Sequence, residues 1–231
     1  MRATVTLVAL AVLAGCGTSN ESMPLSPSPV PAPVPDPDPT ASYRVTFEAT
    51  WSAATHPSMF PATPHFSGLI GATHEEGLRL WQGGTIASNG IEAMAELGAK
   101  TPFDMEIQRA IDAGRAEHLL SGGGIARSPS AVALDFDISL DKPSVTLVSM
   151  IAPSPDWFVG VANLSLLDNG DWVDALVVDL NPYDAGTDSG ASYESRDRDT
   201  TPREAIAHIT TPPLASNGNV PPLGTFTFHR R

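Results

Sequence analysis

Alternation of apolar and polar side chains predicts two half-buried strands in this chain. Tyr43, Val45, Phe47 and Ala49 alternate with polar residues, which is the period of two expected when one face of a strand is buried. The same period recurs over residues 132–138, where acidic side chains occupy the opposite face. We therefore expect both segments to place one face in a core and the other face in solvent.

Further segments complete the prediction of a mainly β fold. Residues 144–152 form a nearly continuous run of aliphatic and β-branched side chains, as expected of a central strand. Additional strands are predicted at 158–164, 172–180 and 224–229. Because most of these segments are separated by long loops or loops rich in proline and glycine, we expect an antiparallel β-sandwich.

One or two short helices are expected to be inserted into this sandwich. Thr101 precedes Pro102, and apolar residues at helical spacing follow before Gly114. A threonine N-cap, a proline in the first turn and a glycine beyond the end are typical helix boundaries. A second short helix is predicted over 91–97, and the three glycines at 122–124 are predicted to form the turn between the helix and the next strand.

The first sixteen residues have the features of an export signal. Arg2 is followed by twelve uncharged, mostly apolar residues, fewer than the ~20 needed to span a bilayer but typical of a secretory signal core. The core ends in Leu-Ala-Gly and then Cys16, the only cysteine of the chain. This ending resembles the lipobox of bacterial lipoproteins, which implies a signal peptide at 1–15 and acylation of Cys16. An ordinary secretory signal with a chance cysteine is the alternative.

Residues 16–41 are predicted to comprise the lipidated cysteine and a disordered, proline-rich stalk. Proline occupies every second position from Pro27 to Pro39, and its fixed φ favours an extended polyproline-type spacer. The rest of the chain, 42–231, is long enough for one domain with one core. The resemblance to a lipobox, with Gly17 after the cysteine, predicts that the protein is located in the bacterial cell envelope, at the outer membrane or cell surface.

The charge of the chain excludes some partners. Asp and Glu number 26 against 13 Lys and Arg, which gives a formal net charge of −13. Such a chain has no general attraction for nucleic acid or for anionic lipid head groups, so we expect no nucleic-acid partner and a membrane link through the covalent lipid. Since no second cysteine is present, the domain is expected to fold without disulfides.

Three stretches, taken in order, carry a resemblance to a known family. They are Trp51-Ser52, His56-Pro57, Phe60-Pro61 and His65 to His74; then Ser154 to Gly160; then Pro182 to Gly190 with Tyr193-Glu194-Ser195. The set resembles the spondin N-terminal domain (F-spondin type) across roughly residues 42–211. The resemblance implies a β-sandwich, extracellular placement, a bound Ca²⁺ and no catalytic activity. The chain lacks the cysteines and adjoining repeat domains of the animal proteins, so their partners are not transferred to it.

The acidic loops suit the calcium ion that the resemblance implies. Calcium takes six to eight oxygen ligands from carboxylates, carbonyls and water, and loops supply all of these. Asp184 and Asp188 lie on either side of a turn at Gly186, and Asp156 lies in a second loop. The resemblance implies that Asp156, Asp184 and Asp188 are the carboxylate ligands. The alternative is that both loops are simply turns in which aspartate bonds to its own backbone.

Other side chains raise competing interpretations. His56, His65 and His74 recur nine residues apart, which suggests zinc, although this is not the spacing of a helical metal pair and no HExxH motif is present. Packed, hydrogen-bonded histidines are therefore favoured. The four tryptophans are expected in the core, with an exposed Trp157 touching a glycan or protein as the alternative.

The sequence thus predicts a calcium-binding, membrane-anchored adhesion or interaction module whose protein or glycan ligand is unidentified. No nucleophile elbow, P-loop or dinucleotide-binding motif is present, so we do not expect an enzyme. A structural or calcium-holding envelope lipoprotein without a protein partner is the main alternative. A carboxylate-dependent hydrolase is the least favoured one.

Overall fold

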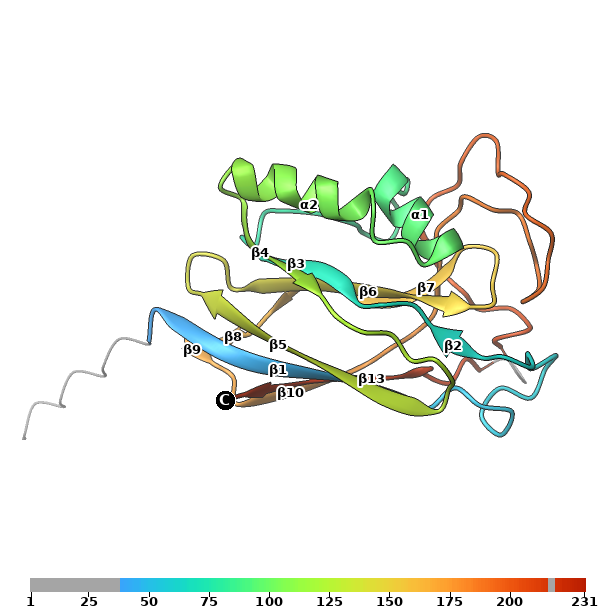
Figure 1. The fold of residues 1–231 in the computed structure, drawn as a ribbon, viewed down its shortest axis with the longest axis horizontal. Coiled ribbons are helices and arrows are strands. Elements are labelled where there is room, and N and C mark those ends of the chain that lie inside the picture. Colours follow the sequence, from blue (N-terminus) through green and yellow to red (C-terminus); the bar gives the residue numbers. More distant parts are fainter. Residues whose placement is uncertain (1–37, 216–218) are drawn as a thin grey trace, which may run out of the picture. The chain divides into compact units, whose positions relative to one another are not determined.

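The computed structural model of the chain describes residues 38–215 and 219–231. These residues form two antiparallel sheets packed face to face, with two helices on the outer face of one sheet (Figure 1). The expected β-sandwich with inserted short helices is thereby confirmed. The predicted signal peptide, Cys16 and nearly all of the predicted stalk lie outside the described residues.

The first sheet contains the chain's two most regular alternating segments. Its strands, in spatial order, are β10 (Ala175–Asp179), β13 (Gly224–Arg230), β1 (Thr40–Ala49) and β5 (Ser130–Ser139). Tyr43, Val45 and Phe47 of β1 are fully buried, whereas the residues between them face outward. The period of two in the sequence therefore corresponds to a sheet with one face in the core and one in solvent.

The second sheet is longer and carries the loops of interest. Its order is β12 (Ala207–His208), β11 (Tyr183–Asp184), β7 (Trp157–Ser165), β6 (Ser144–Ala152), β3 (Ile70–His74) and β4 (Ala116–Ser121), with β2 (His65–Phe66) also paired to β6. A separate two-stranded ribbon joins β8 (Leu167–Asp168) to β9 (Asp171–Trp172).

Burial on both faces explains the continuous apolar run of β6, all nine residues of which are buried. Val145 and Leu147 point into the core between the sheets. Val148 and Met150 point into a second core beneath the helices. A strand covered on both faces has no polar side to present, which is why period-two alternation is absent here.

The two helices form this second cover. Helix α1 (Asn89–Leu97) begins after Ser88, whose hydroxyl accepts the Ile91 N–H at 3.2 Å, and ends at Gly98 with φ of 63°. Helix α2 (Phe103–Asp112) follows closely. Within the described part of the chain, neither helix has the length and apolarity needed to cross a bilayer.

Two boundary predictions were wrong. The strand expected at 172–180 is divided between β9 and β10, because the chain leaves the ribbon at Val173 and joins the first sheet at Ala175. The hydroxyl of Thr101 does not cap α2; it donates to the Asp104 carboxylate at 2.8 Å, and the helix starts at Phe103.

Strands β3 and β4 were not predicted. Strand β3 places three small residues between Ile70 and His74, which gives no alternation to detect, although all five of its residues are buried. Strand β4 lies between α2 and the triple glycine, so the expected turn at 122–124 leads from β4 to β5 and not from the helix to the next strand.

We expect Gly71→Ala to destabilise the domain. A Cβ atom at Gly71 would lie 1.9 Å from the carbonyl oxygen of Thr146 in the paired strand, so β3 and β6 would have to separate. Overpacking of this kind costs about 1–3 kcal/mol. Urea unfolding of the variant measures the loss. Gly77→Ala is the matched control, because the nearest atom there is 3.8 Å away; equal midpoints for the two variants would contradict the close approach of these strands.

Candidate metal centre

The two predicted acidic loops lie side by side at one end of the second sheet. Asp156 directly precedes β7, and Asp184 ends β11, which pairs with β7 so that Asp184 lies opposite Trp157. The Ala185 N–H also donates to the Asp156 carbonyl at 3.1 Å. Strand pairing, and not proximity in sequence, therefore brings the two loops together.

Asp156 is the most deeply buried carboxylate of this region, with no exposed surface. Its Oδ2 atom accepts the backbone N–H groups of Thr187 at 2.8 Å and Asp188 at 3.0 Å, and the Thr187 hydroxyl at 3.3 Å. Its Oδ1 atom is buried and has no hydrogen-bond partner. Burial raises the pKa of Asp156, with the Asp188 carboxylate adding to the rise against the donors at Oδ2.

Asp188 is nearly buried and organises the loop that follows it. Its carboxylate accepts the N–H of Gly190 at 2.6 Å and the N–H of Arg198 at 2.8 Å. These bonds close the segment between Gly190 and Arg198 into a loop fastened at both ends to one side chain. Asp188 thus lies between Asp156 on one side and this loop on the other.

Asp184 is held in a turn of its own. Its Oδ1 atom accepts the Gly186 N–H at 2.8 Å. Gly186 has φ of 74°, as the turn expected from the sequence requires, and a Cβ there would lie 2.3 Å from the Glu204 carbonyl oxygen. Burial raises the pKa of Asp184 to about 6, with the Asp156 carboxylate as the next cause.

The three aspartates do not border one common cavity. Asp188 lines a small hollow of about 120 Å³, whereas Asp184 lines a separate one of about 360 Å³ beside Trp157 and Glu204. Across residues 38–215 and 219–231, no three His, Cys, Asp or Glu side chains are grouped as a metal site. An ion at Asp156 and Asp188 would therefore need backbone oxygens and water as well as carboxylates.

Glu96 is an acidic neighbour that the sequence did not reveal. It lies in the last turn of α1 and lines the same small hollow as Asp188. Burial raises the pKa of Glu96, and the carboxylates of Asp156 and Asp188 are among the causes that add to the rise. One feature of the sequence could have indicated a special role for Glu96. An acidic residue in the last turn of a helix interacts unfavourably with the helix dipole, and α1 has no basic residue there.

The three histidines lie in different places and use their ring nitrogens locally. His74 Nε2 bonds to the Thr146 hydroxyl at 2.8 Å and its Nδ1 to the Glu75 carbonyl at 2.7 Å. His56 bonds to the Thr55 hydroxyl and the Pro221 carbonyl, each at 3.0 Å. His65 bonds to the carbonyl of Thr63. These contacts are those of the packed histidines favoured above.

Trp157 is not the exposed contact residue considered above, since only 3% of its surface is accessible. It packs edge-on against Tyr193 with ring centroids 5.5 Å apart. The other three tryptophans are also buried, as expected. The aromatic rings near the acidic loops therefore support these loops from the core and do not form an exposed surface.

The structure is thus an antiparallel β-sandwich with a cluster of acidic loops at one end of its second sheet. A family model described as Spondin_N matches residues 41–219, and the chain belongs to the spondin N-terminal family. Relatives include Spondin-1 of Gallus gallus, which is 38% identical over an alignment of 179 residues that covers 74% of this chain and 22% of that protein. Spondin-1 of Homo sapiens is 36% identical over the same length.

Spondin-2 of Rattus norvegicus is 31% identical over 203 residues, covering 82% of this chain and 62% of the relative. The chain spans about a fifth of the length of the Spondin-1 relatives it matches. The family is one of extracellular, adhesion-type domains, and the resemblance inferred from the three sequence stretches is confirmed.

We expect His74 to make folding stability fall in mild acid. Burial lowers the pKa of His74 below its usual 6.5, so above that pH the ring is neutral in both the folded and unfolded states. As pH falls through 6.5, the unfolded state binds a proton that the folded state does not bind, and stability is lost. Urea unfolding at pH 7.5 and 5.5 should show a smaller loss for His74→Gln than for the unchanged chain.

His65→Gln is the matched control, since that ring is half-exposed and bonds only to a local carbonyl. The raised pKa values of Asp156 and Asp184 make the folded state more stable as pH falls, which opposes the effect of His74. The test therefore compares the change in stability between variants and does not rely on the absolute change of any one variant. Equal pH slopes for His74→Gln and the unchanged chain would show that His74 is not kept neutral.

Proposed function

We propose that the domain is an exported, calcium-stabilised interaction module without catalytic activity, anchored to a membrane through the acylated Cys16. The observation that supports calcium most directly is the Oδ1 atom of Asp156, a carboxylate oxygen that is fully buried and lacks a partner. A buried charge without a partner is costly, and proteins compensate such groups with an opposite charge or a metal ion.

Electrostatics at the loop cluster favour a cation. Two carboxylates about 5 Å apart repel by roughly 3 kcal/mol at an effective dielectric near 20, and a divalent ion reverses the sign of this interaction. The raised pKa values of Asp156 and Glu96 both include repulsion from neighbouring carboxylates. A cation that lowers these pKa values would stabilise the folded state at neutral pH.

Oxygen ligands without nitrogen or sulfur suit calcium better than zinc. We assign Asp156 and Asp188 as the central carboxylates and add Glu96, because it borders the same hollow as Asp188. Asp184 is retained from the family resemblance as a further ligand, although it borders a different hollow. Backbone carbonyls and water complete the coordination shell.

An interaction role is proposed because the family consists of extracellular, adhesion-type domains. The identity of the protein or glycan partner does not follow from the relatives, since this chain corresponds to a minor part of Spondin-1. Anchoring through Cys16 rests on the resemblance of the first sixteen residues to a lipobox.

We expect calcium to raise the melting temperature of the protein. A ligand at a hundredfold excess over its Kd stabilises the folded state by about 2.7 kcal/mol, which for a domain of this size is a shift of roughly 5–10 °C. Calorimetry in calcium and in chelator measures the shift. Asp156→Asn keeps the size of the side chain but removes its charge, and should melt at one temperature in both buffers.

Asp179→Asn is the control for this experiment, because Asp179 is an exposed carboxylate on β10 in the first sheet, whereas the acidic loops lie at the end of the second sheet. It should keep the full calcium response. Identical melting curves of the unchanged chain with calcium and with chelator would reject the ion site, and a full response in Asp156→Asn would place the ion elsewhere.

Cys16→Ser should release the protein from the membrane. A serine has no thiol to form the thioether to a diacylglyceryl group, so labelled fatty acid should no longer be incorporated and the protein should move from the membrane fraction to the soluble fraction. Fractionation of expressing bacteria with a radiolabelled palmitate feed measures both effects. Unchanged labelling or unchanged sedimentation of the variant would rule out the anchor at this residue.

A further inference from the structure

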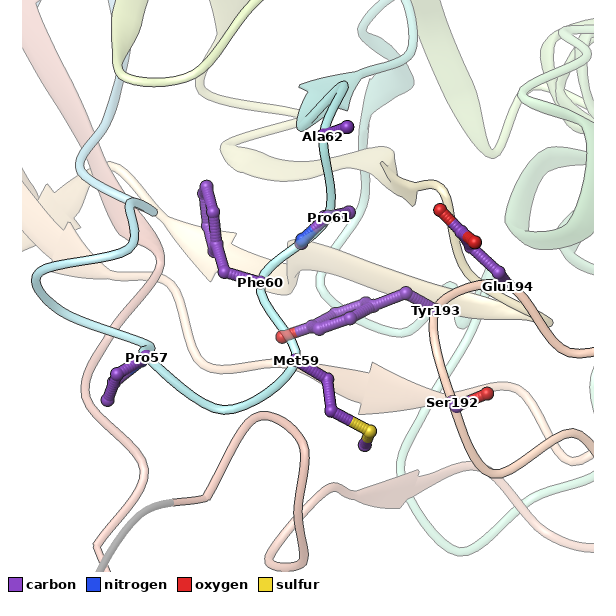
Figure 2. A pocket seen from close by; sticks show the side chains of 8 residues that line it. All are labelled: Pro57, Met59, Phe60, Pro61, Ala62, Ser192, Tyr193 and Glu194. Atoms are coloured by element: carbon purple, nitrogen blue, oxygen red, sulfur yellow. The ribbon is translucent and has the colours of Figure 1, made fainter.

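A groove lies at the end of the sandwich where β1 finishes, between two loops distant in sequence (Figure 2). One wall comes from Pro57, Met59, Phe60 and Pro61, and the other includes Tyr193 and Glu194. The hollow measures about 510 Å³, which lies within the usual range for ligand sites. It is separate from the hollow that Glu96 and Asp188 share.

The groove has a rigid aromatic floor. Phe60 and Tyr193 both pack against Trp51, with ring centroids 5.4 and 5.5 Å away, and Trp51 is fully buried. Tyr193 also packs against Trp157 at 5.5 Å. Because the rings are fixed by the core of the sandwich, the groove is formed before any ligand arrives.

Met59 is an unusual residue at the rim. Its side chain is 63% exposed, and its φ of 48° places a non-glycine residue in the left-handed region. Both features cost free energy, and neither is needed to fill the core. Methionine is a flexible, polarizable side chain that adapts to apolar ligands, so its position suggests a contact with a partner.

Two polar groups lie at the groove, and only one of them is open to a ligand. The Tyr193 hydroxyl is buried, and Figure 2 shows it directed toward the turn at Met59 and Phe60. Because this hydroxyl has no accessible surface, it belongs to the floor of the groove. Glu194 is exposed and is the one charged residue of the lining.

Extended proline-rich peptides match these properties. Grooves lined by aromatic side chains bind the polyproline II conformation, whose carbonyl groups have no internal hydrogen bonds and accept bonds from the groove. A basic residue in the peptide would complement Glu194.

We propose that this groove binds an extended, proline-rich segment of another protein that carries a basic residue beside its prolines. The apolar side of the segment packs on Phe60 and Met59, and its basic residue pairs with Glu194. This names a partner class for the interaction role proposed above and rests on that role, but the groove is a different site from the candidate metal centre.

The groove and the metal centre are connected through one loop. Tyr193 and Glu194 belong to the segment that the Asp188 carboxylate fastens at Gly190 and Arg198. A cation at Asp188 would therefore steady one wall of the groove. Peptide binding is expected to be tighter in calcium than in chelator.

The test measures binding of fluorescent peptides to the full chain by anisotropy. The probe is Arg-Pro-Leu-Pro-Pro-Leu-Pro, and comparison probes replace its arginine with glutamate or its prolines with glycine and serine. Met59→Ser should weaken binding of the probe about five- to tenfold, as loss of an apolar contact in an interface does. Met105→Ser is the matched control, because Met105 is a half-exposed methionine on α2 and should leave binding unchanged.

Glu194→Lys should invert the preference, so that the glutamate peptide binds about tenfold tighter than the arginine peptide. No binding of the arginine probe, or equal binding by the Met59 and Met105 variants, would overturn the proposal. Competition by a chitin or cellulose oligosaccharide would reassign the groove to glycans. Tighter binding of a peptide with the sequence of residues 27–39 would reassign it to the chain's own proline repeat.

Failure of this proposal is distinguishable from failure of the calcium proposal. Calorimetry without peptide decides whether an ion binds, and the Met59 and Glu194 variants leave the carboxylates of the metal centre intact. Peptide binding that depends on Met59 and Glu194 supports the groove even if calcium has no effect on melting. A calcium-dependent melting temperature with no peptide binding supports the ion and rejects the groove.

Discussion

Asp156 brings a carboxylate into the interior, and three donors from the neighbouring turn hold one of its oxygens. The Thr187 and Asp188 N–H groups reach Oδ2 only because β11 pairs with β7 and sets the two loops in register. Hydrogen bonds from backbone donors favour the charged form, whereas burial disfavours it, and burial is the larger effect. The carboxylates of Asp184, Asp188 and Glu96 all interact electrostatically with this side chain.

The second sheet supplies the rigid support that such an arrangement requires. Strand β6 is buried on both faces, with one core between the sheets and another under the helices. Helix α1 covers one of these faces and carries Glu96 toward Asp188. A helix that appears in the sequence as an interruption of the β pattern therefore helps both to bury the sheet and to place a carboxylate.

The sequence predicted those strands in which apolar side chains follow a regular pattern along the chain. Alternation in β1 and β5 and the apolar run in β6 identified the strands, and Ser154 to Gly160 with Pro182 to Gly190 identified the acidic loops. Strand β3 escaped prediction because Gly71 and Ala72 are small, and its tight packing on Thr146 is a property of the folded chain. Glu96 escaped because its approach to Asp188 depends on how a helix crosses a sheet, which no local period encodes.

Strand β10 forms one edge of the first sheet among the described residues, and its composition suits that position. Val177 is 60% exposed there, so the strand offers apolar surface and unpaired backbone groups to any similar strand. Asp174 and Asp179 bracket it, and a second copy approaching edge to edge would bring further carboxylates close to these. Charged residues at a sheet edge oppose such pairing, which protects the protein from polymerising through its own backbone.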